Sequence, residues 1–254
     1  MLGNSMRKLS LSLAAQLHVE REIDSNKYRF VIGVDEVGRG SWAGPLCVGA
    51  VLYDLKHLLG FMTEKDADTF GMESQKLPNY SEYLRVNDSK KLSPRLRASL
   101  EQPIKALANG YGLGFVEPAE LDKLGMTSGL TLGLERALAP LREFVGSSLL
   151  LLDGGVNFSG FPDVRTYVKG DSKSFAIASA SILAKVERDA LMERESIHFP
   201  WYVFEKNKGY PSPAHVSALH AIGPSQIHRK SWSYMENLPW QMPIHNTKQL
   251  QMEF

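Results

Sequence analysis

The sequence has a single cysteine, Cys47, almost no net charge and no long apolar run. One cysteine excludes an intramolecular disulfide and a cysteine-rich zinc site, and its place in the apolar segment 45–53 favours a buried side chain in a reducing compartment. Because 29 lysines and arginines oppose 28 acidic residues, any surface that attracts anions must be local. No segment approaches the roughly 18 apolar residues of a membrane span, so we expect no membrane contact.

The first residues are basic and then weakly apolar, but serines and polar residues interrupt them. This pattern is too weak for a secretory signal peptide and predicts a short, helical N-terminal extension over residues 1–27. We therefore expect a cytoplasmic protein.

The chain has 254 residues, of which 43% are hydrophobic and 22% charged, as in ordinary globular proteins with a sizeable core. Short apolar runs rich in strand-forming residues predict strands in segments 28–34, 45–53, 111–116, 148–152 and 164–168. Because the first two are joined by a short link, they favour an antiparallel hairpin. Helical patterns lie between the later strands, so we predict an α/β fold with a mixed sheet flanked by helices.

The helical segments carry recognisable start and stop signals. Ser93 followed by Pro94 predicts a helix start, and Pro103 predicts a break or kink in that helix. Two helical patterns in 118–144 are separated near Gly125, and the alanine-rich segment 175–199 predicts a long helix close to the sheet. The C-terminal region should form short helices and loops. The charged, irregular segment 55–86 is interpreted as a surface loop or insertion.

Acidic residues recur where predicted strands end, at Asp35, Glu36, Asp153 and Asp171. Convergent carboxylates repel one another unless they are protonated or hold hard cations such as Mg²⁺ or Mn²⁺. Two such ions roughly 3.5 to 4 Å apart would favour phosphodiester hydrolysis. The alternative for each residue alone is turn chemistry, helix capping or a solvated strand end.

Gly38, Arg39 and Gly40 directly follow the first acidic pair. Two glycines around an arginine suit a loop whose backbone approaches a sugar or phosphate, although a plain turn is the alternative. Tyr210, between a glycine and a proline, could stack on a base or sugar or could simply pack. Local basic clusters suited to phosphate contacts are Lys90 with Lys91, Lys169 with Lys173, and residues 228–230, whose alternative is a solvated surface.

The sequence lacks the residue patterns that are typical of several other kinds of active site. The seven histidines include no helical pair at metal-binding spacing and have no cysteine partner, which disfavours zinc. There is no phosphate-binding Walker loop and no nucleophile elbow. A loose dinucleotide-binding pattern over 38–43 leads into a strand rather than the required helix, and we discard it.

From about Tyr28 to Trp232 the sequence resembles type 2 ribonuclease H, ribonuclease HII. The shared motifs occur in the family's order and read GVDEVGRGSWAGP, NDSKKLS, LLLDG, KGDSKSFAIASASILAKVERD, NKGYPSPAH and IHRKSW. The resemblance implies a ribonuclease H-like fold with a helical C-terminal region. It also implies hydrolysis of the RNA strand of RNA/DNA hybrids with Mn²⁺ or Mg²⁺, leaving 5′-phosphate and 3′-hydroxyl ends.

By the same resemblance, Asp35, Glu36, Asp153 and Asp171 are the catalytic, metal-binding carboxylates. The loop of Gly38, Arg39 and Gly40 would read the 2′-hydroxyl at the cleaved junction, Tyr210 would pack on its ribose, and Lys90 would contact the substrate. These roles imply cleavage at single ribonucleotides embedded in duplex DNA. The expected partners are RNA/DNA hybrids and ribonucleotide-containing DNA, with a sliding-clamp or polymerase contact as a further hypothesis, and the expected state is a monomer.

The implied organisation is a catalytic domain over 28–232 with an insertion at about 55–86, and a C-terminal tail over 233–254. The insertion is longer than the link expected in the family, and the N-terminal extension leaves no room for the additional domain of ribonuclease HIII. Two alternatives remain. One is a metal-dependent phosphomonoesterase, although the Asp-x-Asp pair of Asp66 and Asp68 lies away from any predicted strand end. The other is a catalytically silent nucleic-acid-binding module.

Overall fold

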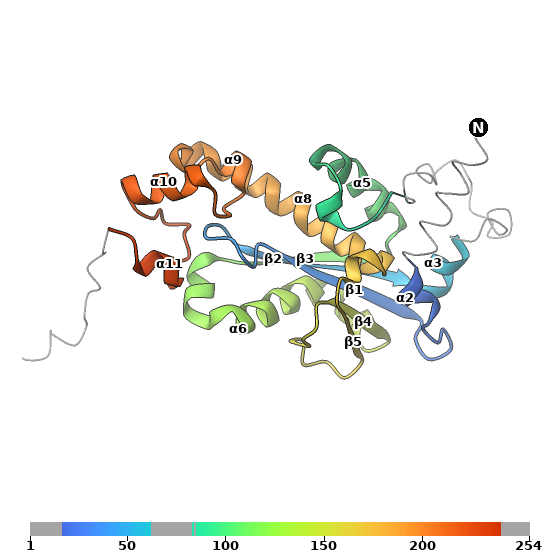
Figure 1. Cartoon of the computed structure of the whole chain (residues 1–254). Coiled ribbons are helices and arrows are strands. Elements are labelled where there is room, and N and C mark those ends of the chain that lie inside the picture. Colours follow the sequence, from blue (N-terminus) through green and yellow to red (C-terminus); the bar gives the residue numbers. More distant parts are fainter. Residues whose placement is uncertain (1–16, 62–82, 84, 240–254) are drawn as a thin grey trace, which may run out of the picture.

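A five-stranded mixed sheet lies between two layers of helices (Figure 1). The computed structural model describes residues 17–61, 83 and 85–239. The strand order is β3-β2-β1-β4-β5, and β2 runs antiparallel to both of its neighbours while β1, β4 and β5 are parallel. The strands are β1 Phe30–Val37, β2 Leu46–Asp54, β3 Gly110–Val116, β4 Ser148–Asp153 and β5 Val164–Tyr167.

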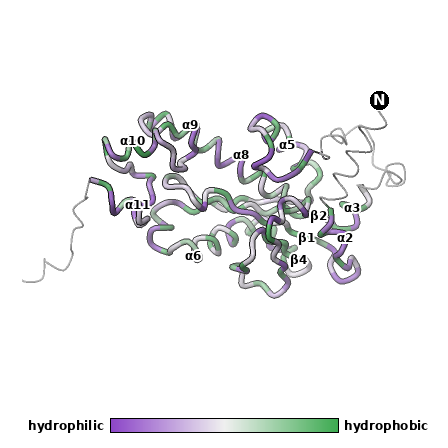
Figure 2. The backbone as a smooth tube through the Cα atoms, in the orientation of Figure 1, coloured by the Kyte–Doolittle hydropathy of each residue, from purple (hydrophilic) through white to green (hydrophobic). Residues whose placement is uncertain are grey.

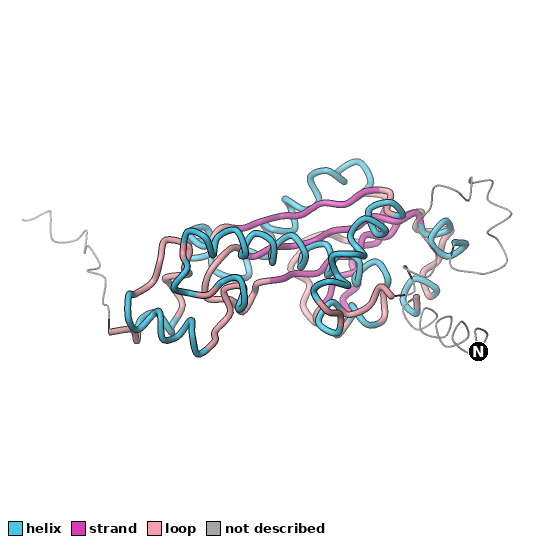
Figure 3. Tube along the Cα trace, turned by 90° about the horizontal axis from the view of Figure 1, so that it is seen from above, coloured by secondary structure: helices cyan, strands magenta, loops and turns pink. Residues whose placement is uncertain are grey.

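Helices α5 and α8 cover one face of the sheet, and α6 covers the other (Figures 1 and 3). Short helices α9, α10 and α11 gather at one end of the molecule. The helices are α2 His18–Arg21, α3 Leu55–Phe61, α5 Pro94–Leu107, α6 Pro118–Leu138, α7 Arg142–Val145, α8 Phe175–His198, α9 Phe204–Asn207, α10 Pro213–Ile222 and α11 Ser233–Glu236, with 3₁₀ turns η1 Ser89–Lys91, η2 Ala139–Leu141, η3 Gly170–Ser172 and η4 Pro200–Tyr202.

Alternation along the strands builds a core on each face of the sheet. In β1, Val31 packs in the cluster that includes α8, whereas Ile32 and Val34 pack in the cluster that includes α6. Successive side chains of a strand point to opposite faces, so one strand supplies both cores. Hydrophobic stretches accordingly lie along the sheet in the centre of the molecule (Figure 2).

Helix α8 lies unusually close to the sheet because the strands present glycine to it. A Cβ atom at Gly33 would lie 2.0 Å from the backbone of Ala176, and one at Gly49 would lie 2.6 Å from the carbonyl oxygen of Ala180. Small residues on both sides therefore allow the backbones to touch, as the alanine-rich sequence predicts. This contact brings residues of α8 within reach of the end of β1.

A third cluster joins the C-terminal region to the rest of the fold. Tyr202, Phe204, Leu219 and Met235 are buried around Met192 on α8. The C-terminal short helices are thus packed onto the last turns of α8 through one shared hydrophobic cluster.

Two sequence predictions about helices are corrected. The predicted break at Pro103 is wrong, because α5 continues through it to Leu107, whereas the alternative of a kink there stays a prediction. Segment 55–86 is not irregular throughout: its first residues form α3, and Leu55 and Leu58 are fully buried. Apolar side chains at helical spacing fold this segment into a helix, although charged residues surround them in the sequence. The interruption near Gly125 is confirmed, with a φ of 76° inside α6. Asp66 and Asp68 lie outside the described residues.

Candidate active site

Asp35 and Asp153 lie side by side at one edge of the sheet. Strands β1 and β4 are parallel neighbours, and their register pairs Val34 with Leu152, one residue before each carboxylate. Parallel strands place their carboxyl ends at the same edge, where α/β folds hold their sites. Strand β1 does not stop at the acidic pair as predicted but continues to Val37, because β2 pairs with both acidic residues.

The carboxylate of Asp35 is buried beside two other acidic side chains. Its side chain is only 7% exposed. Burial raises its pKa well above the usual range, and the neighbouring charges of Asp153 and Glu36 raise it further. Burial also raises the pKa of Glu36, which Arg39 partly offsets from 3.6 Å. Three of the predicted carboxylates thus act on one another directly.

Asp171 joins the group from η3, the turn before α8. Burial raises its pKa to about 6, and the charges of Asp88 and Asp153 contribute. The side chain of Asp88 contacts that of Asp171, and this contact raises the pKa of Asp171 further. Asp88 was missed by sequence reasoning, although it lies in the NDSKKLS motif that was singled out for its lysines.

Lys90 is a cation whose pKa responds to the carboxylates of this site. Burial lowers its pKa, but the carboxylates of Asp35, Asp171, Asp88 and Asp153 outweigh burial and raise it. The structure therefore brings the predicted Lys90 together with all but one of the predicted carboxylates. Lys169 and Lys173 lie on the adjoining loop, where the Nζ atom of Lys173 donates to the carbonyl of Val168.

Two serines support Asp35 from behind. Ser181 on α8 hydrogen-bonds to the Asp35 carboxylate. Its hydroxyl oxygen also lies 2.9 Å from that of Ser89 in η1. Either hydroxyl can be the donor in the bond between the two serines. This chain ties the NDSKKLS turn to the end of β1.

The donor set is chemically suited to a hard divalent cation. It consists of carboxylate oxygens, the ligands that Mg²⁺ and Mn²⁺ prefer. Burial and mutual repulsion raise the pKa values of Asp35 and Asp171, and a bound divalent cation would offset that repulsion. In the described part of the chain no three acidic, histidine or cysteine side chains are already gathered at metal-binding distances. Binding would therefore need side-chain rotation.

The loop after β1 is closed by Tyr210. The backbone N–H of Gly38 donates to the Tyr210 hydroxyl at 3.1 Å, and Gly38 has a φ of 86° that suits glycine. Gly40 faces the same ring, since a Cβ atom there would lie 4.0 Å from it. Arg39, the residue between the glycines, reaches Glu36. The glycine–arginine–glycine loop, Tyr210 and the carboxylates thus form one continuous site.

Two fully buried arginines, Arg188 and Arg229, donate hydrogen bonds to backbone carbonyls in and around this loop. Arg188 on α8 donates to the carbonyls of Pro45, Ala43 and Lys208 and to the hydroxyl of Ser41.

Arg229 donates to the carbonyls of Gly44 and Arg39 at 3.0 to 3.2 Å. Burial lowers its pKa to about 9. The interpretation of residues 228–230 as a basic cluster for phosphate contacts, or alternatively as a solvated surface, is therefore wrong for His228 and Arg229, which are buried, while Lys230 is exposed. The guanidinium of Arg229 is buried because it donates hydrogen bonds to loop carbonyls, and a sequence pattern does not reveal such partners.

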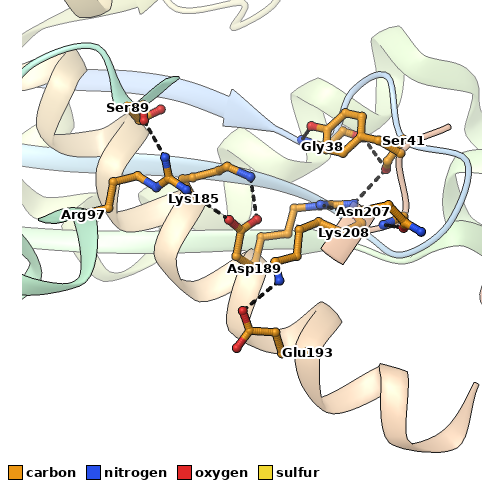
Figure 4. A network of polar contacts seen from close by, with 12 residues as sticks. Gly38, Ser41, Ser89, Arg97, Lys185, Asp189, Glu193, Asn207 and Lys208 are labelled. Atoms are coloured by element: carbon orange, nitrogen blue, oxygen red, sulfur yellow. Dashed lines mark hydrogen bonds and ion pairs between the residues drawn. The ribbon is translucent and has the colours of Figure 1, made fainter. Parts of the chain in front are cut away.

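A polar network runs along α8 between the two halves of the site (Figure 4). Arg97 on α5 donates to the carbonyl of Ser89 and lies 3.6 Å from Asp189, which also binds Lys185 at 2.6 Å. One turn further, Glu193 binds Lys208 at 2.8 Å. The same helix therefore connects the NDSKKLS turn with the segment that carries Tyr210.

Comparison with known proteins agrees with this geometry. Residues 72–235 match the sequence profile of the family described as Ribonuclease HII. Proteins of that name from Streptomyces griseus and Streptomyces coelicolor are 40% and 37% identical, over 84% and 83% of this chain and 81% and 80% of theirs. The protein from Thermus thermophilus is 38% identical over 84% of this chain and 91% of its own. The chain belongs to the ribonuclease HII family.

Solved structures show the same fold. Ribonuclease H2 from Pyrococcus horikoshii OT3 aligns with a TM-score of 0.57 and 24% identity over 82% of this chain and 95% of its own. RNase HII from Archaeoglobus fulgidus, solved with PCNA, aligns at 0.59 and 22% over 84% and 98%. The sheet order and flanking helices are thus those of a ribonuclease H-like fold, and the chain is a ribonuclease H hydrolase. No helix in the described ranges has the length and hydropathy to cross a membrane.

Proposed function

We propose that this ribonuclease HII cuts the RNA strand of RNA/DNA hybrids and cuts duplex DNA on the 5′ side of a single embedded ribonucleotide. The observation that carries the proposal is the contact of Tyr210 with Gly38 directly beside the carboxylates. A 2′-hydroxyl is the group that distinguishes RNA from DNA at one nucleotide. A backbone reader three residues after Asp35 would place that group next to the scissile phosphate.

Asp35, Glu36, Asp153 and Asp171 would hold Mg²⁺ or Mn²⁺, with Asp88 as a further oxygen donor. When bound, the ions supply activation of a water molecule and stabilisation of the leaving oxygen. Bst-RNase HIII, which has the same fold with a TM-score of 0.61 and 16% identity, was solved in complex with Mn²⁺. In this chain the serine chain behind Asp35 orients that carboxylate toward the substrate side.

The remaining predicted residues would hold the nucleic acid. Lys90 lies in the field of the carboxylates, where its ammonium group can contact the phosphate that they would otherwise repel. Arg39 is largely exposed, and its ion pair among the described residues is the one with Glu36, so its guanidinium can also contact a second phosphate. The aromatic face of Tyr210 would pack on the ribose whose 2′-hydroxyl the glycine loop contacts.

The test uses a labelled DNA duplex with one ribonucleotide, incubated with Mn²⁺, Mg²⁺ or EDTA. Matched duplexes carry deoxyribose or 2′-O-methylribose at that position, and a fourth substrate is a long RNA/DNA hybrid. We expect metal-dependent cleavage 5′ to the ribonucleotide, with 5′-phosphate and 3′-hydroxyl ends, and no cleavage of the two matched duplexes.

Other outcomes separate the components of the proposal. Cleavage of the hybrid alone would contradict the roles of the glycine loop and Tyr210 and leave the carboxylate assignment intact. Absence of all cleavage, with release of phosphate from small monoesters, would favour the phosphomonoesterase alternative. Binding without cleavage would favour the silent module.

Several expectations stay predictions. These are the monomeric state, the cytoplasmic location and the division into residues 1–27, 28–232 and 233–254. A clamp contact is suggested for the tail by the solved Archaeoglobus complex with PCNA, which concerns that protein. Residues 240–254 lie outside the described part of the chain.

A further inference from the structure

Two buried histidines lie ring against ring behind Tyr210. The Nε2 atoms of His215 on α10 and His228 are 2.9 Å apart, and both side chains are almost completely buried. Nδ1 of His215 lies 2.9 Å from the carbonyl oxygen of Tyr210. Nδ1 of His228 lies 2.9 Å from the backbone nitrogen of Ser225. The two rings therefore join Ser225 to Tyr210 through three successive hydrogen bonds.

The ends of this chain determine where its hydrogens lie. The Tyr210 carbonyl can only accept, so His215 carries its hydrogen on Nδ1. The Ser225 N–H can only donate, so Nδ1 of His228 carries none. One hydrogen remains between the rings, on Nε2 of His228, and it is donated to His215. All three bonds are satisfied when both rings are neutral.

The surroundings keep both rings neutral. The rings of Tyr202 and Phe204 pack against both histidines, with centroids 4.7 to 5.9 Å away. Burial lowers the pKa of His215, and burial together with His215 lowers that of His228 to about 3. The hydrogen-bonded arrangement is thus a fixed part of the folded protein at neutral pH.

The anchored carbonyl belongs to the residue whose side chain contacts the glycine loop. The backbone N–H of Tyr210 donates to the carbonyl of Asn207 at 2.9 Å, so His215 supplies the second of two backbone restraints. Pro211 follows and limits the freedom of the peptide further. With its backbone held on both sides, Tyr210 directs its hydroxyl to Gly38.

We propose that His215 is a positioning residue for Tyr210, and that His228 and Ser225 act on Tyr210 through it. The inference rests on the proposed role of Tyr210 at the ribose. A histidine that merely fills space would contribute to stability alone, whereas this histidine also sets the orientation of a substrate-contacting ring. Its removal should therefore affect the choice between substrates and not only the stability of the fold.

The first test compares His215→Asn with His215→Leu. An asparagine amide can donate to the Tyr210 carbonyl from near the Nδ1 position, and leucine cannot. We expect His215→Leu to lower kcat on the single-ribonucleotide duplex about tenfold more than on a long hybrid, and His215→Asn to recover most of the loss. His198→Leu, at the exposed end of α8, is the control and should change neither rate. Equal loss in both His215 variants would overturn the proposal.

A double-mutant cycle with Tyr210→Ala shows whether His215 acts through Tyr210. The effect of His215→Leu on substrate choice should disappear in the Tyr210→Ala background. An undiminished effect there would contradict the positioning role. If Tyr210→Ala itself left substrate choice unchanged, the proposed ribose contact would fail instead, so the two failures are distinguishable.

The hydrogen positions can be measured in the unmodified chain, whatever the variants do to folding. Side-chain ¹⁵N NMR at neutral pH should show two neutral imidazoles, His215 protonated on Nδ1 and His228 on Nε2. A neutral His215 with its hydrogen on Nε2 would have no Nδ1 hydrogen to donate to the Tyr210 carbonyl, and this result would overturn the proposal.

Discussion

The hydroxyl of Tyr210 accepts a hydrogen bond from the backbone N–H of Gly38, although 172 positions separate the two residues in the chain. The contact joins the C-terminal region to the loop that follows β1. Since this loop begins one residue after Asp35 and Glu36, the position of an aromatic ring is tied to the position of the carboxylates. In the proposed function, recognition and hydrolysis would therefore share one structural unit.

Replacing Tyr210 should separate recognition from hydrolysis. Tyr210→Phe removes the hydroxyl that Gly38 contacts but keeps the ring, and Tyr210→Ala removes both. We expect cleavage at a single ribonucleotide to fall about tenfold in the Phe variant, which loses one hydrogen bond. It should fall about a hundredfold in the Ala variant, which also loses a stacking contact of about 1–3 kcal/mol, with hybrid binding less affected. Cleavage rates and Kd on both substrates check this. An equal loss in cleavage and binding would count against the role at the ribose.

Asp35→Asn and Asp153→Asn should abolish cleavage without unfolding the protein. Loss of metal-assisted stabilisation worth several kcal/mol corresponds to at least about a thousandfold in rate. Because Asp35 is buried beside like charges, its neutralisation should also raise the Tm of the metal-free protein. Asp24→Asn, at an exposed turn, is the matched control. Substantial turnover in either variant would disprove the carboxylate assignment.

Arg229→Lys should loosen the glycine–arginine–glycine loop. A lysine cannot span the carbonyls of Arg39 and Gly44 as the guanidinium does. Leaving a buried carbonyl unpaired costs about 1–3 kcal/mol, so we expect lower stability in urea unfolding and a higher KM. Lys230→Ala, at the exposed neighbouring position, should leave stability unchanged. A fully stable Arg229→Lys protein would show that the buried arginine does not hold the loop.

We expect the free energy of unfolding to fall as pH rises, because Glu20 is buried. It is fully buried and accepts hydrogen bonds from Ser174 and Ala176 at the start of α8, and burial raises its pKa from 4.5 to about 7. A raised carboxyl pKa contributes stability below pH 4.5 that is lost as pH rises through 7.

The loss amounts to on the order of 3 kcal/mol at 1.36 kcal/mol per pKa unit. Urea unfolding at pH 5 and pH 8 should show a smaller pH effect in Glu20→Gln than in the unmodified protein. The exposed Glu22→Gln variant should keep the full effect. Identical pH dependence in the Glu20→Gln protein would refute the assignment.

The sheet and the acidic positions could be predicted from the sequence because the signals are local. Apolar runs marked all five strands. Asp35 and Glu36 lie near the end of β1, Asp153 is the last residue of β4, and Asp171 follows β5 by four positions. Gly125 was identified as the interruption in α6 because glycine tolerates a positive φ there. Each of these features depends on a few neighbouring residues, which a sequence pattern contains.

The supporting residues could not be predicted, because their roles depend on partners far along the chain. Asp88 meets Asp171, Ser181 meets Asp35, and Arg229 meets the carbonyl of Gly44 across 185 positions. A basic or polar side chain in a loop sequence gives no sign that it will be buried. The sequence therefore predicted the groups that we propose to face the substrate and missed the residues that contact those groups from the protein interior.

Helix α8 contacts both halves of the site, through Ser181 at Asp35 and through Arg188 at the loop carbonyls. These two residues are seven positions apart, about 10 Å along a helix axis. In the proposed function, this helix would set the distance between the bond that is cut and the sugar that is recognised. An insertion within that stretch would change the spacing and the angle together, so α8 would act as a ruler that assigns the cut to one particular phosphate.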